Sequence, residues 1–405
     1  MKKTTIRNNL IVNQIREIYY YMKNNKYSNF KNIHSIQKNS IILVSHDGSK
    51  QGAEVLLLYI AKWYYEHNIP LVIISRKHGR IISDFTKYGY ITVINRKSKI
   101  EKFIKKLNND FDCRYVLLNT IVNGDLTEVF SRNNFKIITA IHELDNTIIQ
   151  FGLSKNLHSA TQYSDYIIFP SQFVKQRIED NIMKISCQTV CKPQGLFLIN
   201  ESIPADQAKE QLKHRYPQTI QGDSIIILGV GFASERKGTD IFFNMAYESY
   251  KRHDNHIFVW IGQNVDKFYE KIRSEKNIEN LPNLILPGYI DDANEINIYY
   301  HACDIFCLTS REEPFGSVIL EAFHAHKPIV AFEKSGGYTD FVINNETGLL
   351  AKQYDFIDMY NQLLELNDLN KREELGNNGF EKTKALSFDN YCRTFLELFG
   401  YPNIP

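Results

Sequence analysis

The residues best suited to chemistry lie between Glu313 and Glu321, two glutamates that are eight positions apart. An apolar, strand-like run ends at Thr309, and an apolar, helix-like run begins at Ile319. The first turn of a helix has free backbone N–H groups, and a loop glycine lets a ligand approach the backbone. The stretch therefore predicts an anion site flanked by two carboxylates, which suits the phosphates and hydroxyls of a sugar nucleotide.

A second loop carries two adjacent cations, Arg236 and Lys237, between Gly231 and Gly238. The apolar run before it predicts a strand over 224–230, and the segment after it predicts a helix over 239–252. Arginine can hold phosphate oxygens in a fork, and lysine acts as a point charge. The loop is therefore a candidate diphosphate site; the alternative is a solvated pair of loop charges.

The first half of the sequence offers two more candidate ligand contacts, Gly52 and His142. Gly52 lies in the loop between the apolar strand 40–45 and the helix 55–65, which offers another helix N-terminus. His142 directly follows the apolar run 136–141, so it would lie at the carboxyl edge of a parallel sheet, where ligands bind. The alternatives are a simple strand-to-helix turn and a hydrogen-bonded structural histidine.

Strand and helix patterns alternate through both halves, which predicts an α/β chain with two Rossmann-like, doubly wound parallel sheets facing one cleft. The expected parts are a basic extension, an acceptor-side domain, a nucleotide-sugar domain, and a terminal helix returning to the first domain. Their predicted bounds are 1–38, 39–198, 199–385 and 386–405.

The extension has eight Lys and Arg residues and one acidic residue, Glu17, with apolar groups near helical spacing. It could rest on an anionic membrane as a basic amphipathic helix. It could equally be a solvated helix packed on the first domain.

Composition limits the remaining classes. A net charge of +2 predicts no bulk attraction to nucleic acid. The six cysteines form no zinc pattern, and we expect reduced, mostly buried thiols and no obligatory metal. No apolar run approaches the ~20 residues of a membrane helix, and no signal peptide is visible. We therefore expect a cytoplasmic protein, with peripheral contact at the inner face of the plasma membrane if the extension binds lipid.

Together these stretches resemble the retaining, nucleotide-sugar-dependent glycosyltransferases of family 4, which have the GT-B fold. Glu313 to Glu321 matches the E-x7-E signature of that family, and 231–238 aligns with its phosphate-binding loop. Further matches are Gly336-Gly337, 345–350, Gly52-Ala53-Glu54 and the pair His142-Glu143, and the resemblance covers about 40–395. Two departures are Phe232, where the family usually has arginine, and Gln51, where it often has glycine.

The resemblance implies the following roles. Lys237 and Arg236 would stabilise the departing nucleoside diphosphate, helped by the amides of Gly316, Ser317 and Val318. Glu313 would bind hydroxyls of the donor sugar, Glu321 the ribose, and His142 the sugar near its anomeric carbon. A donor phosphate oxygen would take the acceptor proton, so that no carboxylate base is needed and the anomeric configuration is retained. The other predicted contacts are Gly52, Gly231, Gly288, Tyr289, Phe315, Gly316, Ser317 and Val318.

The leading prediction is thus a hexosyltransferase that moves a sugar from a UDP- or GDP-sugar, with no obligatory cofactor, to a cell-envelope glycan, a lipid-linked acceptor or a protein. The alternatives are another GT-B enzyme, such as a sugar-nucleotide epimerase, and a non-catalytic nucleotide-sugar-binding scaffold subunit. The donor base, sugar, acceptor, linkage and oligomeric state are left open by the sequence.

Overall fold

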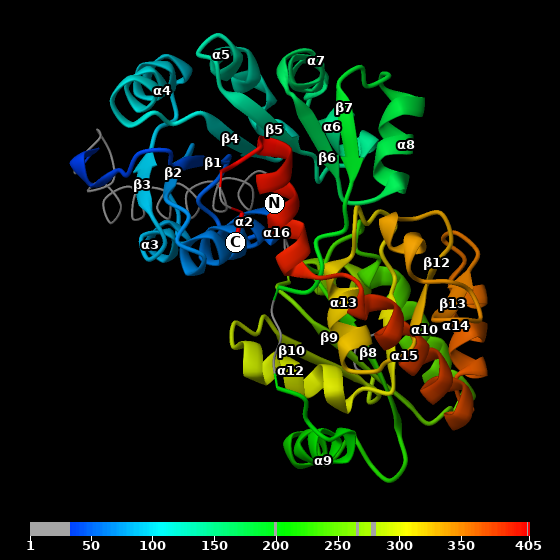
Figure 1. The fold of residues 1–405 in the computed structure, drawn as a ribbon. Coiled ribbons are helices and arrows are strands. Elements are labelled where there is room, and N and C mark those ends of the chain that lie inside the picture. The colour runs from blue at the N-terminus through cyan, green and yellow to red at the C-terminus, as the bar shows by residue number, and fades with distance from the viewer. Residues whose placement is uncertain (1–32, 198–200, 265–266, 277–280, 403) are drawn as a thin grey trace. The chain divides into compact units, whose positions relative to one another are not determined.

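The computed structural model describes residues 33–197, 201–264, 267–276, 281–402 and 404–405 (Figure 1). Most of the predicted basic extension, residues 1–32, lies outside the described residues, and both interpretations of it stay predictions. The chain forms two compact units. The first comprises 1–170, 174–192 and 388–405, and the second comprises 171–173 and 193–387.

The first unit is built on a seven-stranded parallel sheet with the order β3-β2-β1-β4-β5-β6-β7. Its strands are β1 (Ile41–Ser45), β2 (Leu71–Ser75), β3 (Tyr90–Val93), β4 (Tyr115–Asn119), β5 (Lys136–Ala140), β6 (Tyr166–Phe169) and β7 (Gln188–Cys191). Its helices are α2 (Gly52–Glu66), α3 (Ile82–Phe85), α4 (Lys97–Phe111), α5 (Thr127–Ser131), α6 (Asp145–Gln150), α7 (Ser154–Tyr163), α8 (Gln172–Asn181, whose first residues group with the second unit) and α16 (Phe388–Phe399), with 3-10 turns η2 (Ile33–Ser35) and η3 (Ile121–Leu126).

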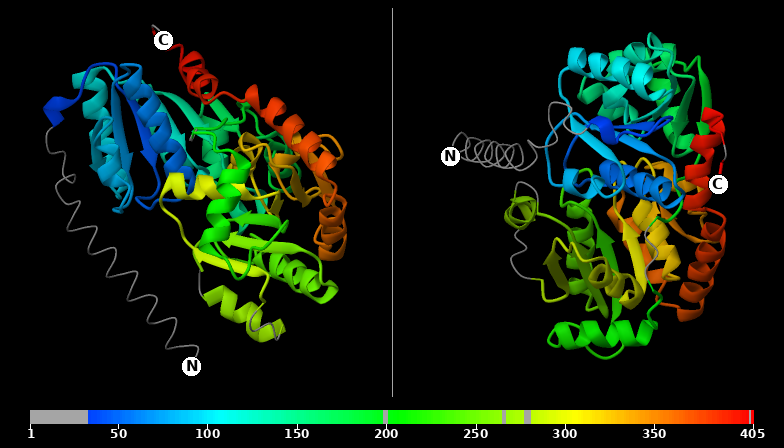
Figure 2. Two further views of the ribbon diagram at one scale, coloured as in Figure 1. Left: turned by 90° about the horizontal axis from the view of Figure 1, so that it is seen from below. Right: turned by 60° about the vertical axis from the view of Figure 1, so that its left-hand side comes forward.

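Side chains on both faces of this sheet are buried, as expected for continuous apolar strands between two helical layers. Ile42 and Val44 of β1 pack into one core with Phe103 of α4 and Phe130 of α5. The alternate β1 residues point to the opposite face, because successive strand side chains alternate. Figure 2 shows α2 and α4 on opposite sides of the sheet.

The second unit has a six-stranded parallel sheet with the order β10-β9-β8-β11-β12-β13. Its strands are β8 (Ile225–Val230), β9 (His256–Ile261), β10 (Leu284–Gly288), β11 (Ile305–Leu308), β12 (Ile329–Phe332) and β13 (Gly348–Ala351). Its helices are α9 (Ala205–Arg215), α10 (Thr239–Arg252), α11 (Phe268–Lys276), α12 (Ala293–Ala302), α13 (Ser317–His324), α14 (Phe356–Glu365) and α15 (Leu369–Lys384), with the 3-10 turn η5 (Gly337–Asp340).

The second sheet also has one hydrophobic core on each face, because successive side chains of a strand point to opposite faces. Phe306 and Leu308 of β11 pack in the core that contains Ile319 of α13. Ile305 and Cys307, which alternate with them along β11, pack in the core that contains Phe242 of α10. The α/β fold with two Rossmann-like parallel-sheet domains, predicted from the alternating pattern, is confirmed.

The order of each sheet places particular loops side by side. In the first sheet β1 lies between β2 and β4, so the chain leaves β1 to one side and returns on the other. In the second sheet β8 lies between β9 and β11 in the same way. Ligands of doubly wound sheets bind outside the carboxyl ends of the strands at such points. The loops 46–51 and 231–238 begin at these points, at the carboxyl ends of β1 and β8.

Local structure departs from the sequence patterns at three places. The segment 338–343, whose pattern predicts a helix, starts in the 3-10 turn η5, and the segment 121–133, whose pattern predicts mostly helix, begins as the 3-10 turn η3. Helix α6 was not predicted, because its six residues are too few to establish a helical period. The predicted domain boundary after 198 lies slightly beyond the observed change of unit, between Lys192 and Pro193.

The terminal helix α16 packs within the first unit, against α2. The indole Nε1 of Trp63 donates a 3.0 Å hydrogen bond to Asp389 Oδ1, and the Arg393 guanidinium lies 5.7 Å from the Trp63 ring centroid. The ring of Phe399 lies 5.4 Å from that of Tyr115 on β4. The last residues of the chain therefore add to the core of the first unit.

Candidate functional site

Two loops of the second unit, 231–238 after β8 and 309–316 after β11, are held together by backbone contacts. Gly238 has a φ of 66°, and a Cβ there would lie 1.9 Å from the carbonyl oxygen of Thr309. The hydroxyl of Thr309 donates a 2.9 Å hydrogen bond to the carbonyl of Lys237. Only glycine fits this approach, so the close contact explains why the cation loop ends on Gly238.

The loops bring Lys237 and Glu313 together. The ammonium of Lys237 donates a hydrogen bond to Glu313 Oε2 and forms an ion pair with it. Ser310 Oγ donates to the same oxygen at 3.2 Å. The two charged side chains are 13% and 10% exposed, so water screens the pair only weakly.

The charge state of Glu313 follows from this environment. Burial acts to raise the pKa of Glu313, but the Lys237 and Arg236 charges and the hydrogen bonds from Lys237 and Ser310 outweigh burial and hold it below its ordinary value. Glu313 is therefore ionised at neutral pH. Because both of its hydrogen bonds reach Oε2, the other oxygen, Oε1, is the one suited to accept from a ligand hydroxyl.

Arg236 lies beside Lys237 but is oriented differently. Its side chain is exposed, and Nη1 donates a 2.9 Å hydrogen bond to the carbonyl of Glu312. A second arginine, Arg311, forms a two-bond pair with Asp240, at 2.8 and 2.6 Å, and its backbone N–H donates to the Arg236 carbonyl at 2.8 Å. The sequence analysis did not predict the pair of Arg311 and Asp240. The available signal was their position, two residues before Glu313 and two residues after Gly238.

The predicted anion site at the start of α13 has the expected backbone. Gly316 is the N-cap, with a φ of 82°, and the amide of Ile319 is the first to bond back to it, at 2.9 Å. The amides before Ile319, including those of Ser317 and Val318, belong to the turn that has no intrahelical acceptors. Phe315 differs from the prediction in one respect: its side chain is buried against Phe341, with ring centroids 5.4 Å apart. Only its backbone could meet a ligand.

Glu321 lies one turn further along α13 and is partly exposed. Burial raises the pKa of Glu321, and the hydroxyl of the buried Tyr300 beside it acts in the opposite direction. The two glutamates of the E-x7-E stretch thus have pKa values shifted in opposite directions, which fits two different tasks.

The remaining predicted contacts of this unit lie at the ends of β8 and β10. Gly231 has a φ of 152°, and its carbonyl accepts from the Trp260 indole at 3.0 Å. Gly288 has a φ of 85°, and the next residue, Tyr289, is 48% exposed, with its hydroxyl 2.9 Å from Asp291 Oδ1. An exposed ring that ends a strand at this edge is available to a nucleotide base.

In the first unit, His142 is held in one orientation. The amide nitrogen of Asn119 donates to the carbonyl of Ala53 at 2.8 Å, so its amide oxygen faces His142 Nε2, also at 2.8 Å. That oxygen can only accept, so Nε2 carries the proton. Burial, with the neighbouring His46 acting in the same direction, lowers the pKa of His142 to about 4. The imidazole is therefore neutral, and Nδ1 presents a lone pair.

Glu143 has a different task from its neighbour. Its Oε2 accepts from its own chain, from the backbone N–H of His142 at 3.0 Å and of Ile121 at 3.2 Å. Burial raises the pKa of Glu143 to about 7. This carboxyl thus ties the end of β5 to the turn after β4 and holds His142 in place.

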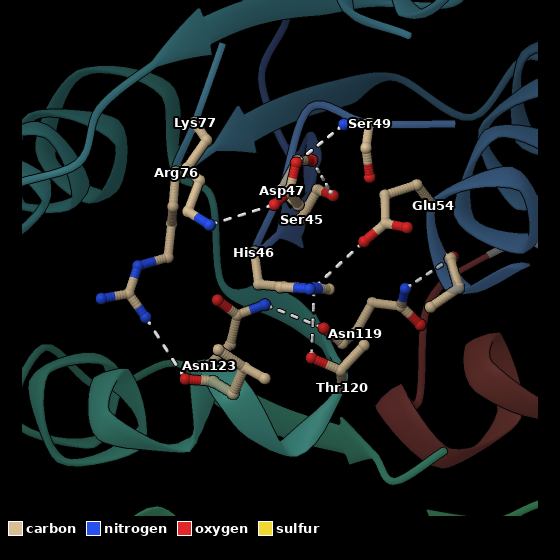
Figure 3. A network of polar contacts seen from close by, with 12 residues as sticks. Ser45, His46, Asp47, Ser49, Glu54, Arg76, Lys77, Asn119, Thr120 and Asn123 are labelled. Carbon is tan, nitrogen blue, oxygen red and sulfur yellow. Dashed lines mark hydrogen bonds and ion pairs between the residues drawn. The ribbon is translucent and has the colours of Figure 1, made fainter. Parts of the chain in front are cut away.

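The sequence analysis named Gly52 but missed the residue opposite it, His46. Gly52 opens α2, and a Cβ there would meet nothing within 4 Å, so no close approach demands glycine in the structure. His46 Nδ1 lies 3.1 Å from Glu54 Oε1 on the first turn of α2 and 3.4 Å from Thr120 Oγ1, as Figure 3 shows. The pattern that identified His142, a histidine directly after an apolar strand, is also present at His46 and could have identified it.

The described part of the chain shows two further properties. It contains no group of three or more His, Cys, Asp or Glu side chains placed to hold a metal ion. Nor does it contain a helix that is both long and apolar enough to cross a membrane. Four of the six cysteines, Cys113, Cys303, Cys307 and Cys392, are buried, which agrees with the expectation of mostly buried thiols.

Comparisons with known proteins show what the chain is similar to. Residues 210–382 match the family described as "Glycosyl transferases group 1". The chain is 30% identical over 255 residues to a protein of Methanocaldococcus jannaschii described as an uncharacterized glycosyltransferase, covering 62% of this chain and 64% of that protein. It is 26% identical over 238 residues to the lipopolysaccharide 1,2-N-acetylglucosaminetransferase of Salmonella typhimurium, covering 56% of this chain and 58% of that enzyme.

These alignments span less than two thirds of either relative. The structure of the Anabaena protein HepE in complex with UDP-glucose superposes with a TM-score of 0.73 at 17% identity, over 89% of this chain and 99% of that one. At that identity the likeness shows the fold. The chain thus has the GT-B fold, and its residues 210–382 are similar to the group 1 glycosyl transferases.

Proposed function

We propose that this protein is a retaining glycosyltransferase that transfers a sugar from a UDP- or GDP-sugar to a glycan or lipid-linked acceptor of the cell envelope. One observation carries the proposal: Lys237 pairs with Glu313 at the carboxyl edge of the second sheet, and the Glu313 side chain lies beside Gly316, the N-cap of α13. A cation, helix amides and a carboxylate at one point suit a sugar diphosphate.

The departing group is stabilised by positive charge. Breaking the bond between the anomeric carbon and the diphosphate places additional negative charge on the phosphate oxygens. Lys237, which is largely buried, and the amides of Ser317 and Val318 are fixed before the reaction, and preorganised donors lower the barrier most. Arg236 is exposed and can move toward the outer phosphate. We expect all of these charges to be met without a metal ion.

The two glutamates serve as donor contacts. Glu313 is ionised and paired with a cation, so it has no proton to give as a general acid. Its Oε1 would accept from hydroxyls of the donor sugar, and Glu321, further along α13, would accept from the ribose. Retention then proceeds without the two-carboxylate geometry of glycoside hydrolases.

In the first unit, His142 would contact the sugar through Nδ1, the nitrogen that its bond to Asn119 leaves as an acceptor. A sugar hydroxyl supplies the matching donor. UDP-glucose in the complex of the Anabaena protein, and the lipopolysaccharide named for the Salmonella relative, support a UDP-sugar donor and an envelope glycan acceptor. We expect no nucleic acid partner.

Peripheral contact with the inner face of the plasma membrane would come from residues 1–38. Deleting 1–35 and measuring sedimentation with anionic liposomes at low salt tests it. A membrane role requires that the deletion weakens sedimentation, and unchanged sedimentation would remove that role.

The proposal is tested with a panel of UDP- and GDP-sugars. Thermal shift identifies the donor that binds, and release of the nucleoside diphosphate measures turnover. The anomeric configuration of the product is then read by NMR. Turnover with retained configuration is expected. Binding with no turnover would instead indicate a scaffold subunit, and interconversion of free sugar nucleotides would indicate an epimerase.

A further inference from the structure

Arg311, in the loop after β11, forms an ion pair with Asp240 on the first turn of α10, and the proposed roles leave this pair unused. Nη1 and Nη2 of Arg311 donate to the two carboxylate oxygens of Asp240 at 2.8 and 2.6 Å. The two side chains are 27% and 26% exposed, so water screens the pair only in part. Two parallel bonds between a guanidinium and a carboxylate fix direction as well as distance. The pair therefore holds the start of α10 and the loop after β11 in one arrangement.

Arg311 also contacts the backbone of the cation loop, 231–238. Its Nη1 donates to the carbonyl of Glu235, and its backbone N–H donates to the carbonyl of Arg236 at 2.8 Å. Together with Asp240, these contacts lie on both sides of Lys237 along the chain. The backbone of Lys237 is thus held from both of its ends.

Two further hydrogen bonds join the same loops. The hydroxyl of Thr309 donates to the Lys237 carbonyl at 2.9 Å, and Nη1 of Arg236 donates to the Glu312 carbonyl at 2.9 Å. Glu312 immediately precedes Glu313. The loop that carries the carboxylate is therefore fixed to the loop that carries the ammonium.

The position of the Lys237 ammonium depends on this support. A lysine ammonium ends a flexible four-carbon chain, and holding it in one place costs conformational freedom. A shift of the backbone moves the ammonium with it, so a fixed ammonium requires a fixed loop. In the structure the ammonium is held by Glu313, and both side chains of that pair are largely buried.

We infer that Arg311 and Asp240 are positioning residues for the sugar transfer: by holding the loops 231–238 and 309–316 together, they keep the Lys237 ammonium where the departing diphosphate gains charge. The inference deepens the proposed function and rests on it. Neither side chain of the pair contacts the donor; both act on the reaction through Lys237.

A positioning role has a kinetic consequence. A charge that is fixed before the reaction stabilises the transition state most, because no reorganisation is needed when charge develops. Interactions that are stronger in the transition state change kcat, whereas interactions that are equal in both states change binding. Loss of the pair should therefore lower kcat and leave the Kd of the donor unchanged. A pair that served the fold alone would change the melting temperature and leave the kcat of the folded protein unchanged.

The test measures release of nucleoside diphosphate from a saturating concentration of the donor found in the panel, with water as the acceptor. Arg311→Met should lower kcat by about 10-fold or more, because a misplacement of about 1 Å can cost about 10²-fold. Arg311→Lys should share this loss, because a lysine keeps the charge but cannot form the two-bond fork. Melting curves check that each variant is folded at the assay temperature.

Arg252→Met is the matched control. Arg252 also belongs to α10 and pairs with a carboxylate, with its Nε 2.8 Å from Glu248 Oε1, but it lies at the opposite end of the helix from Asp240. This variant loses an arginine–carboxylate pair of the same helix and should keep the wild-type kcat. An equal fall in kcat for Arg252→Met and Arg311→Met would show a general effect of lost surface pairs and would overturn the positioning role.

A double variant separates an effect through Lys237 from an independent one. Lys237→Ala removes the group that the pair positions, so adding Arg311→Met to Lys237→Ala should lower kcat little further. Two residues that affect the reaction independently would instead give losses that multiply. Losses that multiply would therefore contradict the inference.

¹H–¹⁵N spectra of the lysine ammonium groups give a readout that needs no turnover. The Lys237 signal, assigned by its loss in Lys237→Ala, should appear in wild type and in Arg252→Met and should broaden or vanish in Arg311→Met. A folded Arg311→Met protein with the wild-type kcat, or with an unchanged Lys237 signal, would overturn the inference alone. Absence of any donor turnover by wild type would overturn the proposed function first, and the inference with it.

Discussion

Lys237 and Glu313, which are 76 positions apart in the sequence, meet as an ion pair between the loops that follow β8 and β11. Each of the two charges therefore affects the position or the ionisation of the other. Glu313 holds the Lys237 ammonium in an ion pair, and Lys237 keeps the Glu313 carboxylate ionised. The site is therefore arranged for a ligand before one binds, which is where preorganised electrostatics gain their effect.

Breaking this pair should cost stability as well as activity. Lys237→Met leaves Glu313 buried without its cation, and we expect the free energy of unfolding to fall by about 2–3 kcal/mol. The double variant Lys237→Met/Glu313→Gln should lose less than the sum of the single losses, measured by denaturant unfolding. Lys251→Met, on the exposed surface of α10, is the control. Strict additivity would show that the two side chains do not interact.

Glu321 should act mainly on donor binding. Ribose contacts are present in the ground state and the transition state alike, so removing them weakens both equally. Glu321→Ala should raise the KM for the donor by about 10-fold, the value of one good hydrogen bond, with kcat within about twofold. A loss confined to kcat would contradict the ribose assignment.

Acid and base should affect stability through different glutamates. Burial raises the pKa of Glu54 to about 7 in the folded protein, above its ordinary value of about 4.5. The folded state then holds a proton that the unfolded state has lost, so this stability is full below about 4.5 and is lost as pH rises through about 7. Glu54→Gln, which stays neutral, should raise Tm at pH 8.5 and leave it nearly unchanged at pH 4.5. An equal shift at both values would contradict the buried carboxyl.

The opposite sign applies to Glu313, whose folded pKa is depressed. Its stabilising effect is present above its unfolded pKa and is lost as pH falls through the lower folded value. The destabilisation caused by Glu313→Gln should therefore be larger at pH 7 than at pH 3, measured by denaturant unfolding. A cost that does not change with pH would show that Glu313 contributes through packing alone.

Much of this architecture was predictable because it depends on local patterns. Continuous apolar strands followed by glycine loops and helices identified the βα units, and a histidine after a strand identified His142. Contacts between loops were not predictable, since they depend on the order of strands in the sheet. The pairs Lys237–Glu313 and Arg311–Asp240 exist because β8 lies beside β11.

Two kinds of error have physical causes. Phe315 lies within a binding motif, but its ring completes the core around Phe341, and the motif does not distinguish a side chain from its backbone. His46 follows an apolar strand as His142 does, but the sequence did not show that Glu54, eight residues later, lies 3.1 Å from it, because this contact depends on where α2 starts relative to the end of β1.

A metal-independent reaction is a separate expectation. In the proposed mechanism, cations and helix amides supply the charge that a divalent ion supplies elsewhere, so donor turnover should be unaffected by excess EDTA. Turnover should also not rise when Mg²⁺ or Mn²⁺ is added back. Loss of turnover in chelator with recovery on Mn²⁺ would require a metal that the proposed mechanism lacks.

The central claim, that Lys237 stabilises the departing nucleoside diphosphate, is tested most directly by the rate of diphosphate release from a saturating donor. Lys237→Ala should lower kcat by about 10²-fold or more, as loss of a preorganised charge donor does, while Lys251→Ala retains the wild-type rate. A Lys237→Ala protein that is folded, binds the donor and turns it over at the wild-type rate would contradict the account.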